Sequence, residues 1–415
     1  MTLIRRLSTA PRNLAEQVIR SRTSLPRWAN RAIDHVADNP DGLFGRLAAR
    51  SLGSYGPDDL PPPTAAPDTD VRVYVGPTNY AAQGWSWSRA LDGAGGSVGA
   101  RNMAVAVPGG FNFTADTEVP VAVYHRSREW QERELEAVLR FTHVLFEAER
   151  PLFGRLFSRD VAQEARELAA RGVSTAFMCH GTDIRLPSSH VSQTPWSPYL
   201  EPGLYLDRYE AEARRNRALL DSLGRPTFVS TPDLLIDVPY ATWCPVVVDP
   251  VRWARPAPED RERPVVVHVP SHTTIKGTQL IRPVLERLDA EGVVEYREIT
   301  GVPSADMPEI FAGADVVLDQ FRLGSFGVAA CEAMASGRVV VGHVLPQVRD
   351  AVRATTGQDL PVVEATPDTV EEVLRGLAAD PDLRRRICTQ GVEYVREVHD
   401  GRLSATVLLD KWVNA

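Results

Sequence analysis

Short apolar runs alternate with longer amphipathic stretches through most of this chain, and this alternation limits its fold more than any other feature. The first series of expected strands covers residues 71–75, 105–107, 119–124, 143–146 and 175–179. The expected helices between or after these strands begin near residue 83 and cover residues 129–140, 160–171 and 207–223. Strands that alternate with helices are typical of a parallel sheet whose faces are covered by helices.

A second series of the same kind begins near residue 264. Its expected strands cover residues 265–269, 293–299, 316–319 and 339–341. Its expected helices cover residues 278–290, 307–312 and 326–336, and helices at 382–398 and 402–413 close the chain. The pattern predicts an α/β protein with two Rossmann-like, doubly wound domains and a cleft between them. Ligands of such domains bind at the carboxyl ends of the strands.

Changes in composition set the expected domain limits. Residues 1–66 are expected to form a helical extension that ends in a Pro-rich linker, because prolines cannot continue a helix. Residues 67–245 form the expected N-terminal domain, with 400–415 packing back on it, and 246–399 form the expected C-terminal domain. A chain of 415 residues is long enough for two such cores.

Composition also excludes several classes of protein. The net charge of −8 gives no reason to expect a nucleic-acid binder, and no run of about 18 apolar residues predicts a membrane span. The four cysteines are scattered singly, which argues against a zinc site or a disulfide framework and suits a reducing compartment. The first residues also lack the features of a secretory signal. A cytoplasmic protein is expected.

The beginning of the chain is more basic than the rest. Residues 1–50 contain nine arginines and four acidic residues, and their expected helices are amphipathic. Such helices can lie on an anionic membrane surface, here at its cytoplasmic face. A helical appendage packed on the main body is the second interpretation. The sequence leaves both open.

A phosphate site is predicted after the first strand of the second series. Ser271, His272, Lys276 and Gly277 lie between that strand and the next helix. A phosphate there would meet backbone N–H groups at the helix start, a hydroxyl and an ammonium, and Gly277 would allow close approach. Lys276 is one of only two lysines in the chain. An ordinary strand–helix turn with a surface lysine is the alternative.

A second signal follows the expected strand 316–319. Ser325, Phe326 and Gly327 lie where a helix begins and would offer unpaired N–H groups to a diphosphate. Glu332 lies within this otherwise small and apolar helix. A buried carboxylate needs a partner, and the two hydroxyls of a ribose would supply one. An ion pair with an arginine is the alternative.

The first domain offers a third group of candidates after its first strand. Gly76, Asn79, Gln83 and Gly84 belong to a loop that can approach a polar ligand and that opens a helix. This loop does not match the Gly-x-Gly-x-x-Gly fingerprint of dinucleotide binding, which argues against a nicotinamide cofactor. A tight turn without a ligand is the alternative.

Polar residues also follow other strands of the first domain. His180, Asp183 and Arg185 come directly after strand 175–179, so they are expected at the sheet edge, where they could bind hydroxyls or phosphate. Glu147 ends strand 143–146, and His125 follows the expected strand 119–124. His180, Asp183, Glu147 and His125 are the catalytic candidates. The alternative for residues 180–185 is a polar cluster that caps the strand and whose groups hydrogen-bond with one another instead of with a ligand.

These motifs resemble the retaining family-4 glycosyltransferases of the GT-B fold, in particular bacterial members with a Pro-Ser-x-x-x-x-Lys-Gly-Thr loop. The resemblance covers about residues 70–400. It implies that Lys276 grips the donor diphosphate and that Glu332 binds the nucleotide ribose. It also implies that Gly301 and Val302 face the base, and that the loop beginning at Gly76 lies beside the acceptor.

The sequence departs from the family pattern at two positions. Gly324 stands where the first Glu of the Glu-x7-Glu pattern would contact the transferred sugar, and Ser271 stands where many relatives carry Arg. Asp319 or Gln320 could take over the contact with the sugar. Retention of anomeric configuration is therefore implied by analogy alone.

The expected function is transfer of a sugar from a nucleotide diphosphate sugar to an acceptor hydroxyl. No Asp-x-Asp motif follows a strand, so no metal is expected, and the donor substrate takes the place of a cofactor. The acceptor could be a glycan, a lipid, a small molecule or a protein. An epimerase or a phosphorylase-like enzyme of the same fold, and a non-catalytic sugar-nucleotide-binding or scaffold protein, are the alternatives.

Overall fold

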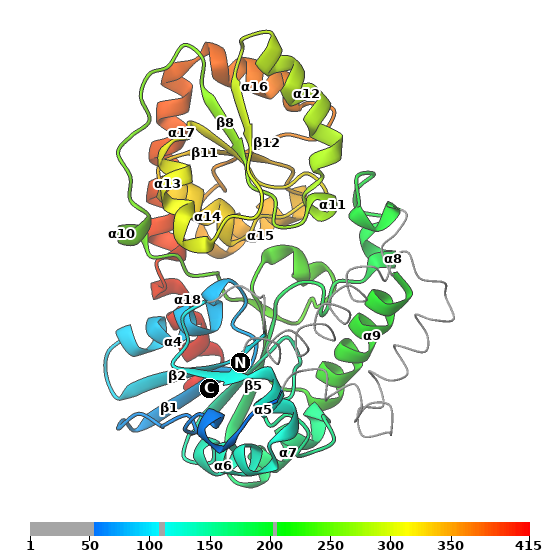
Figure 1. The fold of residues 1–415 in the computed structure, drawn as a ribbon, viewed down its shortest axis with the longest axis vertical. Coiled ribbons are helices and arrows are strands. Elements are labelled where there is room, and N and C mark those ends of the chain that lie inside the picture. The colour runs from blue at the N-terminus through cyan, green and yellow to red at the C-terminus, as the bar shows by residue number, and fades with distance from the viewer. Residues whose placement is uncertain (1–53, 108–112, 202–205) are drawn as a thin grey trace, which may run out of the picture. The chain divides into compact units, whose positions relative to one another are not determined.

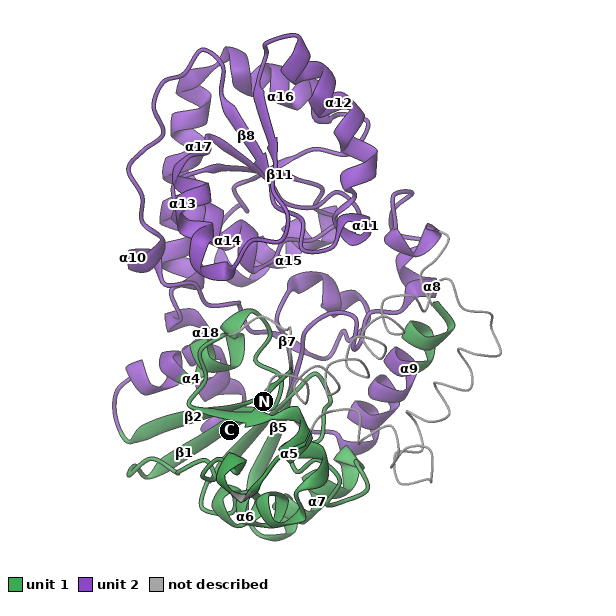
Figure 2. Ribbon diagram, viewed as in Figure 1, with its two compact units in different colours: residues 1–88, 97–177, 202–211 green, residues 89–96, 178–201, 212–415 purple. Residues whose placement is uncertain are grey.

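The computed structural model describes residues 54–107, 113–201 and 206–415 (Figure 1). The basic segment 1–50 lies outside these residues, so the two interpretations of it stay predictions. The chain divides into two compact units, one with residues 1–88, 97–177 and 202–211 and one with the remainder (Figure 2). No helix of the described residues is both long and apolar enough to cross a membrane.

The first sheet has seven strands in the order β3-β2-β1-β4-β5-β6-β7. The strands are β1 (Val71–Gly76), β2 (Val98–Ala106), β3 (Thr117–Pro120), β4 (His143–Glu147), β5 (Ser174–Cys179), β6 (Thr227–Val229) and β7 (Thr242–Trp243). Strand β1 pairs in parallel with β2 and with β4. The strand order reverses between β1 and β4, and such a reversal is where doubly wound sheets bind ligands.

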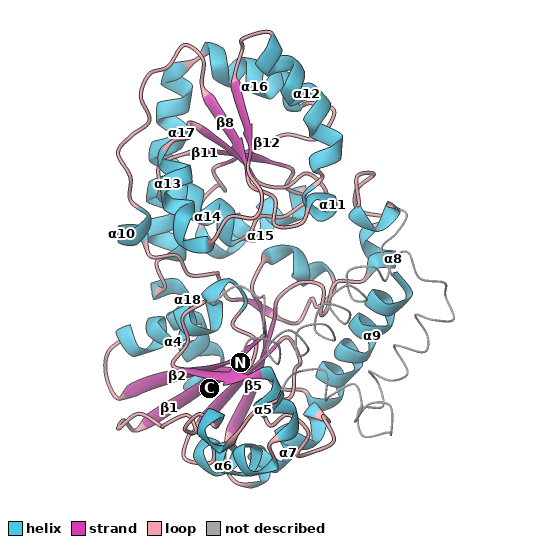
Figure 3. Cartoon of the chain, in the orientation of Figure 1, coloured by secondary structure: helices cyan, strands magenta, loops and turns pink. Residues whose placement is uncertain are grey.

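The helices of this part connect successive strands (Figure 3). They are α4 (Gln83–Gly93), α5 (Val121–Arg126), α6 (Arg128–Val138), α7 (Val161–Ala170), α8 (Pro187–His190) and α9 (Leu206–Leu223). Side chains cap the N-termini of α6 and α7: Ser127 accepts from Trp130 N–H, and Asp160 accepts from Gln163 N–H.

The second sheet has five parallel strands in the order β12-β11-β10-β8-β9. The strands are β8 (Val265–His268), β9 (Glu295–Glu298), β10 (Val316–Leu318), β11 (Val339–Gly342) and β12 (Val362–Glu364). In chain order this is the 2-1-3-4-5 arrangement of flavodoxin-like sheets, and its reversal lies between β8 and β10. The candidate phosphate loops follow those two strands.

Helices on both faces of the second sheet bury its apolar strands (Figure 3). They are α10 (Pro250–Trp253), α11 (Thr273–Lys276), α12 (Thr278–Ala290), α13 (Met307–Ala312), α14 (Val328–Ala335), α15 (Pro346–Thr356), α16 (Val370–Ala379) and α17 (Pro381–Tyr394). Ile281 and Leu285 of α12 pack with Val266, Val339 and Leu374 in one fully buried core. This core holds the starts and ends of the strands in fixed positions.

The last part of the chain packs against the segment between the two sheets. A π-helical turn at Val395–His399 leads to α18 (Arg402–Leu408). His399 Nδ1 lies 2.7 Å from the carbonyl of Val246, and Ser404 Oγ donates to the carbonyl of Pro245 at 2.8 Å. The predicted domain limits themselves stay a prediction.

One predicted strand is wrong in its second half. The apolar run 119–124 was expected to be extended throughout, but β3 ends at Pro120 and Val121–Arg126 forms α5. Five of these residues are apolar, so their pattern has neither period 2 nor period 3.6, and a short apolar run does not distinguish strand from helix. His125 therefore lies at the end of a helix and not after a strand.

Candidate functional site

The loop after β8 carries the first group of predicted ligand contacts. The strand ends at His268, and a short helix, α11, precedes the start of α12. Gly277 joins the two helices with a left-handed backbone at φ 79°. A Cβ at this position would lie 3.1 Å from Cγ of Arg322, so the loop after β10 packs directly on Gly277.

His268 was not among the predicted site residues, although it holds this loop in place. It is 1% exposed, its Nδ1 lies 3.0 Å from the carbonyl of Leu318, and its Nε2 lies 2.9 Å from the hydroxyl of Thr278. Burial lowers the pKa of His268, so the ring is neutral at pH 7. The imidazole thus joins the ends of β8 and β10 to the first turn of α12.

Lys276 and Asp319 meet where β8 and β10 end. The ammonium donates to Oδ1 of Asp319 at 2.5 Å, and the two side chains are 16% and 3% exposed. The backbone N–H of Phe321 also donates to the carbonyl of Lys276 at 3.0 Å. Oδ2 of Asp319 is buried and has no hydrogen-bond partner among the described residues. One face of this carboxylate is therefore unused.

The loop between β10 and α14 has a path that excludes a side chain at Gly324. Gly324 has φ 65°, and a Cβ there would lie 2.5 Å from Cγ of Leu345. The amide of Gln320 donates to the carbonyl of Ser325 at 2.5 Å. A Glu at position 324 would therefore need both a strained backbone and the displacement of Leu345.

Beside Gly327 the same loop leaves open space. Gly327 precedes the first residue of α14 with an extended backbone, and a Cβ on it would meet nothing within 4 Å. The first N–H groups of an α-helix have no partner within the helix. There is therefore open space beside Gly327 at the start of α14, and anion binding there stays a prediction.

Glu332 lies one turn inside α14 and is half-buried. Its carboxylate makes no hydrogen bond or ion pair within the described part of the chain, and Arg252 acts on it only as a charge in the surroundings. Burial raises the pKa of Glu332 to about 8. The alternative of a direct ion pair with an arginine is thus not realised among these residues.

The remaining predicted donor contacts are more exposed. Ser271 and His272 are exposed, and the His272 ring accepts from Ile275 N–H at the start of α11. Gly301 is also exposed and has φ 71°, with Val302 half-buried beside it. Phe326, in contrast, is buried, and its ring packs at right angles to Trp243 and His399. Phe326 therefore supports the loop instead of facing a ligand.

Arg322 is a second residue that sequence analysis did not select. It is 3% exposed, its Nη1 donates to the carbonyl of Ser197 at 3.3 Å, and its Nη2 pairs with Glu201. Its Nε is buried without a partner in the described part of the chain. The guanidinium adds a fixed positive charge close to Gly277. Its position three residues after the expected strand 316–319 was the only signal in the sequence.

The loop after β5 joins a polar network that reaches the loop before α14. The Asp183 carboxylate accepts from the N–H groups of His180 and Gly181, at 2.9 and 2.5 Å. Arg185 pairs with buried Asp233, which accepts from the Ser325 hydroxyl at 2.5 Å. Asp183 therefore binds backbone N–H groups and Arg185 binds a neighbouring carboxylate, which agrees with the alternative of a polar cluster that satisfies its own hydrogen bonds. The hydroxyl of Ser325 donates to Asp233.

In the first unit, Glu147 organises the loop after β1. The fully buried carboxylate accepts from the N–H groups of Thr78 and Asn79, at 3.3 and 3.1 Å. Asn79 has φ 50°, and its side chain accepts from Trp85 N–H and donates to the carbonyl of Thr114. A Cβ on Gly84 would lie 2.7 Å from the Glu147 carboxylate. Glu147 thus positions the loop between β1 and α4.

The other residues predicted around this loop differ in their surroundings. Gly76 ends β1, where a Cβ would lie 3.0 Å from the carbonyl of Met103, and Gln83 is buried at the start of α4. His125 is half-buried, its Nδ1 has no partner among the described residues, and burial lowers its pKa to about 4. His125 is therefore neutral at pH 7 and packs against the ring of Tyr124.

Comparison with solved structures identifies the fold. Sucrose-phosphate synthase from Thermosynechococcus elongatus superposes with a TM-score of 0.51 at 13% sequence identity, over 80% of this chain and 96% of that chain. The two share the GT-B fold. This confirms the predicted α/β fold class with its two parallel sheets.

Two further solved structures are similar at lower scores. WaaG, a glycosyltransferase of lipopolysaccharide biosynthesis, has a TM-score of 0.47 at 12% identity over 82% of this chain and 99% of that chain. Anabaena HepE in complex with UDP and glucose has a TM-score of 0.49 at 11% identity over 82% and 98%. No protein-family model matches the sequence, and no curated protein matches it.

The two glycines before α14 allow a test of this loop. Gly324→Ala should lower the free energy of unfolding by roughly 2–4 kcal/mol, because it adds left-handed strain and a contact with Leu345. Gly327→Ala, the matched control, should change it by about 0.5 kcal/mol or less, since its Cβ meets nothing. Urea denaturation of both variants measures the difference. Equal losses would contradict the described path of the loop.

Proposed function

We propose that this chain is a glycosyltransferase that moves a sugar from a nucleotide diphosphate sugar to an acceptor hydroxyl. The observation that carries the proposal is the pairing of Lys276 with Asp319 at the reversal of the second sheet, beside the open start of α14. The fold shared with a sucrose-phosphate synthase supports a reaction on sugars. The resemblance in sequence supports the same reaction through the same residues.

The diphosphate would bind between Lys276 and the first turn of α14. A diphosphate carries more negative charge than Asp319 and competes with it for the ammonium. The N–H groups after Gly327 would receive the other phosphate oxygens, with the helix dipole favouring negative charge there. As the glycosidic bond breaks, negative charge grows on the leaving diphosphate, and donors already in place stabilise that charge.

The nucleotide ribose would bind to Glu332. A carboxylate accepts hydrogen bonds from both hydroxyls of a diol, and these bonds favour its charged form. Glu332 is half-buried without such partners and has a raised pKa. The two hydroxyls of a diol would supply the hydrogen-bond donors that α14 does not offer to this carboxylate. Gly301 and Val302 are assigned to the base, following the resemblance.

Asp319 is the residue we assign to the transferred sugar. Gly324 has no room for the carboxylate that usually makes this contact, whereas Oδ2 of Asp319 is buried and unpartnered within the described residues. The amide of Gln320 already donates to the carbonyl of Ser325, so we favour Asp319 over Gln320 for this contact. A sugar hydroxyl donating to Oδ2 would place the donor at the carboxyl ends of β8 and β10.

The reaction we propose is metal-independent and retaining. The bond between the anomeric carbon and the diphosphate oxygen breaks, and the acceptor oxygen forms the new bond on the same face. The acceptor proton passes to the departing phosphate, so no side chain need act as a base. This route is consistent with the contacts of Asp183, because its carboxylate accepts hydrogen bonds from two backbone N–H groups and is not needed as a base. A family-4 assignment, the acceptor and contact with a membrane remain parts of the proposal.

A sugar-nucleotide-binding protein without turnover is the second candidate, and the absence of a carboxylate at Gly324 favours it. Incubation with a panel of nucleotide sugars and acceptors separates the two. Release of nucleoside diphosphate that depends on an acceptor supports the transferase. Tight donor binding with no release supports the binding protein, and no binding contradicts both.

Replacement of Lys276 tests the diphosphate site. Lys276→Ala should weaken the binding of free nucleoside diphosphate about 10- to 100-fold, the range for a charged hydrogen bond. Calorimetry with the nucleoside diphosphate and with the nucleotide sugar measures both affinities. Lys411→Ala is the matched control, because Lys411 is the only other lysine and is exposed.

Loss of Lys276 also leaves Asp319 unpaired, and an unpaired buried charge destabilises a protein. The double variant Lys276→Ala/Asp319→Asn removes that charge, so its melting temperature should recover while its affinity for nucleoside diphosphate stays low. An affinity equal to that of the unchanged protein in both variants would refute the assigned role.

The pKa of Glu332 gives a test by pH. Its carboxylate must be charged to accept from both ribose hydroxyls, and a group with pKa about 8 is only about one-tenth charged at pH 7. Donor affinity should therefore rise about ten-fold between pH 7 and pH 9, whereas Glu332→Gln should bind more weakly with no such rise. Donor KM across this range measures the effect. A rise that persists in Glu332→Gln would assign it to another group.

A further inference from the structure

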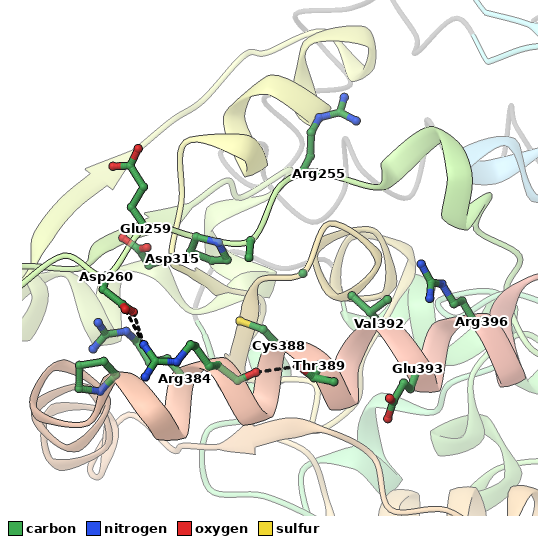
Figure 4. A pocket seen from close by; sticks show the side chains of 15 residues that line it. Arg255, Glu259, Asp260, Asp315, Arg384, Cys388, Thr389, Val392, Glu393 and Arg396 are labelled. Carbon is green, nitrogen blue, oxygen red and sulfur yellow. Dashed lines mark hydrogen bonds and ion pairs between the residues drawn. The ribbon is translucent and has the colours of Figure 1, made fainter.

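A second pocket lies at the opposite edge of the five-stranded sheet from the candidate donor site. Its volume is about 330 Å³, and it lies between the extended segment that contains Pro258 and one face of α17 (Figure 4). Asp315 and Gly337 line it, and they precede β10 and β11. Asp319 follows β10, so about 13 Å of strand separate it from Asp315.

Apolar atoms make up most of the surface of this pocket, although eight of its fifteen lining residues are charged. Cys388 and Val392 face it one turn apart on α17 (Figure 4), and Pro258 also lines it. Arg384 also lines it, and its guanidinium donates three hydrogen bonds, to the carbonyls of Leu377, Ala378 and Arg261. Arg384 is therefore a fixed wall and not a free cation.

Two buried polar atoms of the lining, Nε of Arg255 and Oδ1 of Asp315, have no hydrogen-bond partner among the described residues. Asp315 is 2% exposed, and its Oδ2 accepts from Val265 N–H at 2.7 Å and from Arg261 at 3.1 Å. Its Oδ1 is buried and has no hydrogen-bond partner among the described residues. A buried carboxylate oxygen without a donor is costly, so a ligand that supplies one N–H or O–H group would be stabilised there.

We propose that this pocket binds a small ring-shaped ligand that donates one hydrogen bond to Asp315. Its volume lies at the lower end of the range for small-molecule pockets, about 300–1,000 Å³, which suits one or two fused rings. A flat ring fits the space between an extended segment and a helix, and the Cys388 sulfur packs well against an aromatic edge. This site is independent of the donor site and of the proposed transfer reaction.

Indole and benzothiophene are matched probes, because both are flat and bicyclic and only indole carries an N–H group. Indole should bind the full chain saturably, and benzothiophene about ten-fold more weakly, as expected for a hydrogen bond to a charged acceptor. Saturation-transfer NMR with titration measures both. No saturable binding of indole at millimolar concentration, or equal affinity of the two probes, would overturn the proposal.

Two variants locate the binding. Val392→Trp should fill the pocket and abolish the binding of indole, whereas Asp315→Asn should remove the preference for indole over benzothiophene. Lys276→Ala is the control at the other sheet edge and should bind indole as the unchanged chain does. Indole binding that survives in Val392→Trp would show that it binds elsewhere.

A measurement on the unchanged chain covers the case in which a variant fails to fold. Cys388 is 8% exposed, whereas Cys179, Cys244 and Cys331 are 0% exposed. N-ethylmaleimide should therefore modify Cys388 first, and burial raises the pKa of this thiol to about 11, so the reaction is followed near pH 9. Saturating indole should slow the modification several-fold. An unchanged rate would place indole outside the pocket.

Discussion

The adjacency of β8 and β10 is the constraint on which the candidate site depends. These two strands are neighbours only because the strand order reverses between them, and both deliver their carboxyl ends to one edge of the sheet. Lys276 and Asp319, 43 positions apart, are brought within 2.5 Å by that adjacency. Buried His268 fixes the arrangement, since it bonds to the end of β10 and to the start of α12. The rest of the site is built around this pair.

The sequence predicted the alternation of strands and helices well, because the apolar residues of a long amphipathic helix recur at a clear helical spacing. Helix 278–290 has the predicted limits, since Gly277 separates it from the preceding turn and its apolar residues recur at helical spacing. Helices 307–312 and 207–223 agree to within one residue. The short strands β6, β7 and β12 carry too few side chains to show a period and were missed, whereas β10, also of three residues, was predicted.

The chemistry of the site was only partly predictable, for a different reason. A strand end followed by Lys, Gly and Ser can be found in the sequence, because those residues are close together. The network from Arg185 through Asp233 to Ser325 cannot, because its members lie 48 and 92 positions apart and meet only through the fold. Glu147 and Asp183, assigned to catalysis from their positions at the ends of strands, accept hydrogen bonds from backbone N–H groups.

The glycine at position 324 has a meaning that a sequence comparison alone does not supply. Gly324 has a left-handed backbone, and a Cβ built on it would lie 2.5 Å from Cγ of Leu345, so the loop as it stands does not accept a Glu at this position. The carbonyl of Gly324 also accepts from Leu345 N–H at 2.9 Å, which holds the two segments together. A Glu at position 324 would therefore require Leu345 or the backbone to move. The contact with the donor sugar is therefore part of the proposal for Asp319, because a Cβ at position 324 would lie 2.5 Å from Cγ of Leu345.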